Sequence, residues 1–273
     1  MELQIIAFYF FADELLKASH FYDDLQSKTT NAEIITATLT AAQFFYGNQR
    51  TAANFLKTHH YIPNFVSESR FNRRLHRIPH VIWEKLFSTL SEYFKRNHSS
   101  NEYIVDSFPV PVCDNIRIFR AKIFSGKHYR GYIANKKRYF FGLRVHLIAT
   151  INQEPVECIF TPGAENDISA FKRFDLNLPS GAVIYGDKAY NSYEYEDFLK
   201  ENEIYLVAER KENSKRPLCG CLKFLQNHWR KRIETAFSRI TSIFPKHIHA
   251  VTGKGFELKV FSFILAYSLH FLL

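Results

Sequence analysis

The fold is organised around Tyr103-Ile-Val-Asp-Ser-Phe-Pro-Val-Pro-Val112, a run of β-branched and aromatic residues that predicts a short buried strand. This strand contains one carboxylate, Asp106. An ionised carboxylate is costly to bury unless it is paired or binds a cation. Asp106 therefore directs attention to other acids in similarly apolar surroundings.

Two further acids lie in such surroundings. A second apolar strand, Val183-Ile-Tyr-Gly-Asp-Lys-Ala-Tyr190, runs into Asp187, and the segment Arg230-Lys-Arg-Ile-Glu-Thr-Ala-Phe237 places Glu234 beside a helical apolar stripe. Each acid alone has a structural explanation: an isolated sheet charge, a turn residue, or an i,i+4 partner of Arg230. Their order along the predicted strands and helix favours convergence on one edge of a sheet.

Three converging carboxylates predict a metal site. Oxygen ligands suit hard divalent cations, so we expect two Mg²⁺ ions, with Mn²⁺ as a substitute. Two ions about 3.5–4 Å apart can activate a water or sugar hydroxyl on one side of a phosphodiester and stabilise the leaving oxygen on the other. Asp167 is a fourth acid near the predicted sheet edge, and we expect it to cap a helix rather than bind metal.

The composition favours a polyanionic partner. The 273 residues, 46% of them hydrophobic, are enough for a catalytic domain with a small accessory domain. Thirty-six Lys and Arg against 27 Asp and Glu give a net charge of +9, which suits nucleic acid, although ordinary basic solubility would give the same balance. Four cysteines without a Cys-x-x-Cys pair indicate a reduced, cytoplasmic protein.

A basic helix is predicted near the end of the N-terminal region, over 67–78. It carries apolar residues on one face and arginines on another: Phe71, Leu75 and Ile78 against Arg70, Arg73 and Arg77. No acid at i±4 neutralises the arginines, which favours phosphate contact in a helix-turn-helix-like unit. A solvated helix face would explain the same pattern.

A second basic segment extends over 115–138 and interleaves positive charge with aromatic residues. This pattern suits a nucleic-acid channel, in which cations meet phosphates and rings stack on bases, although a solvated insertion is the alternative. We select Lys136, Lys137 and Arg138 as DNA contacts, together with Lys188 after the second strand.

The chain divides at the polar stretch Asn97-His-Ser-Ser-Asn101. Residues 1–97 read as helices, one of them opened by the capping box Thr30-Asn-Ala-Glu33, and 102–273 form the predicted catalytic domain. The strongly apolar stretch 256–273 approaches the length of a membrane span. Its charged residues favour a buried core helix instead, and we expect no membrane association.

Three acidic segments resemble the motifs of DDE transposases of bacterial insertion sequences, and the nearest resemblance is to the nine-eighty-two family. They are Asp106-Ser-Phe-Pro-Val, Tyr185-Gly-Asp187-Lys-Ala-Tyr190 and Arg232-Ile-Glu234-Thr-Ala-Phe. Related groups carry a tail signature Tyr-x2-Arg-x3-Glu-x6-Lys, of which this chain has Arg230 and Glu234, with Asn227 and Thr241 at the outer places. Arg230 would contact the transposon end or orient the acid.

The resemblance implies an α+β protein in which a ribonuclease-H-like mixed sheet with flanking helices follows an all-helical N-terminal region. It also implies cleavage of the element's own double-stranded DNA ends and joining of the 3′ hydroxyls to target DNA, by a homodimer or larger assembly in the bacterial cytoplasm, at the nucleoid. A ribonuclease-H-like nuclease and a catalytically inactive DNA-binding product are the alternatives. The resemblance to DDE transposases implies that Asp106, Asp187 and Glu234 are the catalytic metal ligands.

Overall fold

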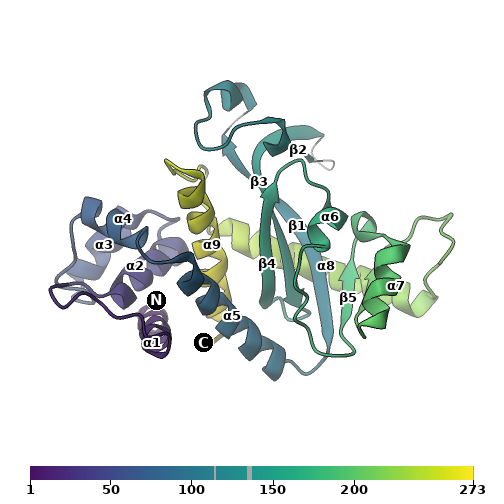
Figure 1. The fold of residues 1–273 in the computed structure, drawn as a ribbon, viewed down its shortest axis with the longest axis horizontal. Helices are drawn as coiled ribbons and strands as arrows, with labels where there is room; N and C mark the ends of the chain where they lie inside the picture. The colour runs from purple at the N-terminus through teal and green to yellow at the C-terminus, as the bar shows by residue number, and fades with distance from the viewer. Residues whose placement is uncertain (114, 134–136, 273) are drawn as a thin grey trace. The chain divides into compact units, whose positions relative to one another are not determined.

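The central sheet is mixed, as the computed structural model of residues 1–113, 115–133 and 137–272 shows (Figure 1). Its described strands are β1 (Glu102–Cys113), β2 (Arg130–Ile133), β3 (Arg138–Thr150), β4 (Pro155–Pro162), β5 (Val183–Gly186) and β6 (Tyr205–Ala208). Their order is β2-β3-β1-β5-β6, and β4 pairs with β3 beside β2. Strands β1 to β4 pair antiparallel, whereas β5 and β6 run parallel to β1.

The strand predicted around Asp106 lies at the centre of this sheet. β1 pairs with β3 along one side and with β5 along the other. Tyr103, Ile104 and Val105 are all buried, because helices and neighbouring strands leave neither face of this strand open to solvent. A short apolar run without alternation is the pattern expected of such a strand.

Helices and 3₁₀ turns alternate with these strands along the chain. They are α6 (Asp167–Phe171), α7 (Tyr193–Glu201) and α8 (Gly220–Ser242), with the 3₁₀ turns η1 (Asn115–Arg120), η2 (Lys127–Tyr129) and η4 (Lys188–Tyr190). α8 buries Ile233 and Ala236, and the ring of Phe237 lies 4.8 Å from that of Phe108 on β1. Packing against β1 therefore brings α8 over the face of the sheet that carries Asp106, because residues 106 and 108 point to the same side.

The N-terminal region is helical, as predicted. It contains α1 (Glu2–Ala18), α2 (Asn31–Phe44), α3 (Gln49–Thr58), α4 (Glu68–Leu75) and the start of α5 (His80–Asn97). α2 opens with the predicted capping box, in which Thr30 accepts from the Glu33 N–H and Glu33 accepts from the Thr30 N–H. After α2 the chain turns at Gly47, whose φ of +74° is a left-handed conformation that suits glycine. The α+β class and the mixed sheet with flanking helices are confirmed.

The chain clusters into two compact units that differ from the predicted division. One comprises 1–90 with 239–273, and the other comprises 91–238. The sequence places the boundary within 97–101 and assigns everything after it to one domain, whereas α9 (Gly253–Leu269) packs on α2 of the helical unit. Within the described residues, one helical stretch, 253–272, is long and apolar enough to cross a bilayer, and 67% of its apolar window is buried in the protein.

Candidate functional site

The first two predicted acids lie on neighbouring parallel strands. β1 and β5 pair through Ile104 and Tyr185, and each strand reaches an acid two residues later, Asp106 and Asp187. Because alternate residues share a face and adjacent strands are about 4.8 Å apart, both carboxylates face the same side of the sheet. They line one small pocket with side chains of α8, whose walls are Val105, Asp106, Tyr185, Gly186, Asp187, Gln226, Arg230 and Ile233.

Electrostatics in this pocket favour a cation. Burial raises the pKa of Asp106 to about 7, and the charges of Asp187 and Asp167 add to the rise, against a backbone hydrogen bond and Arg230 that lower it. Burial also raises the pKa of Asp187, with Asp167 adding to the rise. The pKa of Tyr190 is raised well above its usual value by burial and then by all three aspartates. A positive charge placed between Asp106 and Asp187 would relieve this repulsion.

Local hydrogen bonds orient the two carboxylates. Asp106 Oδ1 accepts from the N–H of Ser107 at 2.7 Å. Asp187 Oδ1 accepts from the N–H of Ala189 at 2.8 Å, so Asp187 also caps the 3₁₀ turn η4. Each bond holds its aspartate in place without neutralising it, which leaves both carboxylates as candidate ligands.

Glu234 lies at the margin of this pocket rather than on its wall. Its side chain is 59% exposed, and one carboxylate oxygen is 3.6 Å from Nε of Arg230, one helical turn earlier. Arg230 itself lines the pocket and donates to Glu209 at 2.9 Å. Among the described residues, no three His, Cys, Asp or Glu side chains are arranged to hold one metal ion. The structure brings Asp106 and Asp187 together and links Glu234 to them through Arg230.

Glu209 is a site residue that the sequence analysis missed. β5 and β6 pair through Gly186 and Ala208, so the next residues, Asp187 and Glu209, extend from the same sheet edge. Glu209 accepts from Arg230, and its other oxygen is 2.9 Å from Nζ of Lys188. The signal was present in the sequence, because Glu209 follows an apolar strand as Asp187 does. Lys188 and Arg230, both predicted DNA contacts, are thus bound to an acid of this chain.

The prediction that Asp167 caps a helix is wrong. Asn166 is the N-cap of α6, and its side chain accepts from the N–H of Ser169 at 2.8 Å. Asp167 is the first helical residue, and its carboxylate accepts from Ser107 Oγ and from Arg144 at 3.4 Å. Asp167 therefore ties α6 to β1 through Ser107 and to β3 through Arg144.

The predicted basic helix forms as α4, with the expected division of faces. Phe71, Leu75 and Ile78 are buried, while Arg70, Arg73 and Arg77 are exposed; these three arginines are called the basic face below. Within the described ranges, no acid forms an ion pair with any of them, so their charges remain available to phosphates. α4 ends at Leu75, shorter than predicted, and Arg77 lies just beyond it.

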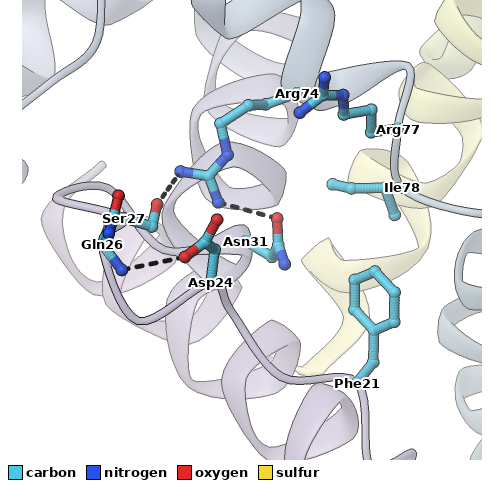
Figure 2. Close-up of a pocket in the computed structure, with 8 residues that line it drawn as sticks. All are labelled: Phe21, Asp24, Gln26, Ser27, Asn31, Arg74, Arg77 and Ile78. Atoms are coloured by element: carbon cyan, nitrogen blue, oxygen red, sulfur yellow. Dashed lines mark hydrogen bonds between the residues drawn. The ribbon is translucent and has the colours of Figure 1, made fainter.

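Arg74 has a different role from its neighbours. It is bound to the loop before α2 and to the start of α2, donating to Asp23 and Asn31 at 2.9 Å each and to the carbonyl of Thr29. Figure 2 shows its hydrogen bonds to Ser27 and Asn31. Arg74 and Arg77 border a pocket of 290 Å³, and the basic face lines a larger one of 490 Å³ beside Lys28. The exposed arginines thus surround a hollow that the internally bound Arg74 helps to shape.

Two other predicted DNA contacts lie at the start of β3. Lys137 and Arg138 are exposed there. Lys136 lies outside the described residues. Arg130 on β2 places its guanidinium 4.4 Å from the ring centre of Tyr139. The interleaving of cations and rings seen in the sequence is therefore a feature of the folded surface.

Comparisons with known proteins identify a family for this chain and a solved structure of similar fold. A family model described as a transposase DDE domain matches residues 96–248. No curated protein sequence matches the chain. The fold is similar to a chain in the cryo-EM structure of a piggyBac transposase synaptic complex with hairpin DNA, with a TM-score of 0.52, 11% identity, and 98% of this chain and 73% of that chain covered.

Proposed function

Because the chain belongs to the transposase DDE domain family, we propose that it cleaves the DNA ends of its own mobile element and joins their 3′ hydroxyls to target DNA. The observation that carries this proposal is the pair Asp106 and Asp187, two carboxylates that share one pocket on adjacent strands. We infer further that the element is a bacterial insertion sequence of the nine-eighty-two type.

The pocket suits a hard divalent cation. Mg²⁺ in proteins is commonly held by one or two carboxylates, with water and phosphate oxygens completing its shell, and the two aspartates match that donor set. A bound cation would activate the attacking hydroxyl and stabilise the leaving oxygen during phosphoryl transfer. The chain's own part is to hold Asp106 and Asp187 in fixed orientation through the backbone N–H groups of Ser107 and Ala189.

We propose that Glu234 is the third metal ligand. We also propose that Glu209 holds Arg230 in place while the protein is free of DNA. Both glutamates contact Arg230: Glu234 from the next turn of α8, and Glu209 from the end of β6. A phosphate entering the pocket would compete with Glu209 for Arg230 and Lys188, which frees both cations to bind the DNA backbone. Exchange of Arg230 between an internal carboxylate and a phosphate should cost little free energy, because both form charge-assisted hydrogen bonds with it.

DNA contact outside the pocket is assigned to the basic face of α4 and to the region of Lys136, Lys137 and Arg138. The similar piggyBac structure contains hairpin DNA, which supports double-stranded DNA ends as the partner here. Two ends must be brought together for joining, so we propose a dimer or larger assembly on DNA in the bacterial cytoplasm.

A strand-joining assay with labelled DNA tests the proposal. The substrate is the DNA that flanks the gene, including any inverted repeats, with Mg²⁺, Mn²⁺ or EDTA present. Joined product identifies a transposase, whereas cut product without joining identifies a nuclease of the same fold. A shifted but intact probe would identify an inactive DNA-binding product.

Single variants locate the third acid within the same assay. Asp106→Asn and Asp187→Asn should each lower the rates of cleavage and joining by several orders of magnitude, while DNA binding persists. Glu234→Gln should do the same if it is a ligand, and Glu209→Gln should retain cleavage. The reverse pattern for these two glutamates would transfer the ligand role to Glu209.

A further inference from the structure

The turn η1, which follows β1, exposes two large apolar side chains. Ile116 is 88% exposed and Phe119 is 99% exposed. Residues three apart eclipse each other in a 3₁₀ turn, so these two side chains project from one side. Arg117 and Arg120 are also three apart, are exposed, and project from the adjacent side. η1 therefore presents an apolar edge bordered by cations.

After Asp114, the sequence around η1 is strongly basic. Residues 115–153 contain no Asp or Glu, and 115–138 contain eight Lys and Arg. η1 packs beside β3, on which Tyr139 is half exposed. The ring of Tyr139 lies 5.0 Å from the ring of Tyr132 on β2. Arg130, also on β2, stacks on the ring of Tyr139. In Figure 1 the segment from η1 to β2 lies at the end of the sheet where β2 is labelled.

We propose that η1 binds unpaired bases of a DNA end, with Phe119 stacking on a base, Ile116 beside it, and Arg117 and Arg120 contacting the flanking phosphates. This inference rests on the proposed function and adds a base-binding element apart from the acidic pocket. Stacking rings beside backbone-binding cations are the combination by which proteins hold single-stranded nucleic acid.

The charge pattern favours DNA over a protein as the occupant. The centre of a protein interface is depleted of charged residues, whereas each apolar side chain here adjoins an arginine. An unpaired base is also favoured over a paired one, because stacking against Phe119 inside a duplex would first require a base step to be opened.

The test compares binding of the full chain to two short DNA probes, one fully paired and one with unpaired terminal bases that include 2-aminopurine. Phe119→Ala should weaken binding to the unpaired probe by about 5- to 150-fold and abolish the quenching of 2-aminopurine fluorescence. Affinity for the paired probe should change less than twofold. Phe119→Trp should retain both the affinity and the quenching.

Phe198→Ala is the matched control, because Phe198 is also exposed but lies on α7 between acids. It should affect neither probe. The inference is overturned if Phe119→Ala weakens both probes equally or neither, or if it dissociates a DNA-free dimer, which would make η1 a protein contact. Cleavage of paired ends by Phe119→Ala would meanwhile leave the proposed function intact. Failure of the unaltered chain to bind any DNA would overturn both.

Discussion

Replacing Asp106 by Asn should stabilise the metal-free protein at pH 7 and above, and hardly at pH 4. Burial raises the pKa of Asp106 from 3.8 to about 7. Between these values the folded state holds a proton that the unfolded state has released, so stability falls as the pH rises through this window. The variant has no such proton to lose, and its stability curve should lack this decline.

The magnitude follows from the difference between the two pKa values. One pKa unit corresponds to 1.36 kcal/mol, so the full difference gives up to about 4 kcal/mol at pH 7. Asp106 retains some solvent contact, which screens part of the effect. We therefore expect Asp106→Asn to raise the free energy of unfolding by about 2–4 kcal/mol at pH 7, and by little at pH 4.

Urea unfolding between pH 4 and pH 8, with and without Mg²⁺, measures this difference. A cation at 100 times its Kd should stabilise the unaltered protein by about 2.7 kcal/mol and should stabilise the variant less. Asp197→Asn is the matched control, since Arg216 lowers the pKa of this exposed acid and its replacement should not be stabilising. Equal stability of Asp106→Asn and the unaltered protein at pH 7 would refute the reasoning that burial, with added repulsion from the neighbouring aspartates, makes the charged form of Asp106 costly without a cation.

Four further predictions concern the rest of the chain. Changing all three arginines of the basic face to Gln should leave the melting temperature unchanged and lower the log–log salt slope of DNA binding by about 0.9 for each lost phosphate contact; an unchanged slope would make this a merely solvated surface. Arg74→Gln should instead destabilise the helical unit by about 1.5 kcal/mol in urea unfolding, because it removes the charged donor of the half-buried Asp23 and Asn31 side chains. Asp167→Asn should cost about 1.5–3 kcal/mol through its contact with Arg144, more than the loss of a helix cap that Asn can replace, and a near-neutral effect would contradict that contact. Phe263→Ala on α9 should destabilise by about 3–5 kcal/mol, and membrane partitioning of the full chain would contradict the core assignment.

Local patterns in the sequence were enough for several features that the structure confirms. The capping box at Thr30, the apolar face of α4 and the strand around Asp106 each depend on residues within a few positions of one another. Asp167 shows the limit of this reasoning. Its neighbour Asn166 competes for the same cap, and only the position of β1 shows which side chain turns toward Ser107.

The sequence by itself determined the helical N-terminal region, the strand around Asp106 and the positions of acids and arginines along the chain, because hydrophobic periodicity and capping are local properties. It did not indicate β2, which lies within the basic segment 115–138. Only the tertiary structure decided the neighbours of each charge. Glu209 meets Lys188 and Arg230 through the register of β5 and β6, and Arg74 is separated from the basic face by its contact with Asp23, 51 residues away. Such pairings depend on strand order and helix placement, which are set by the packing of the whole chain rather than by any short stretch of it.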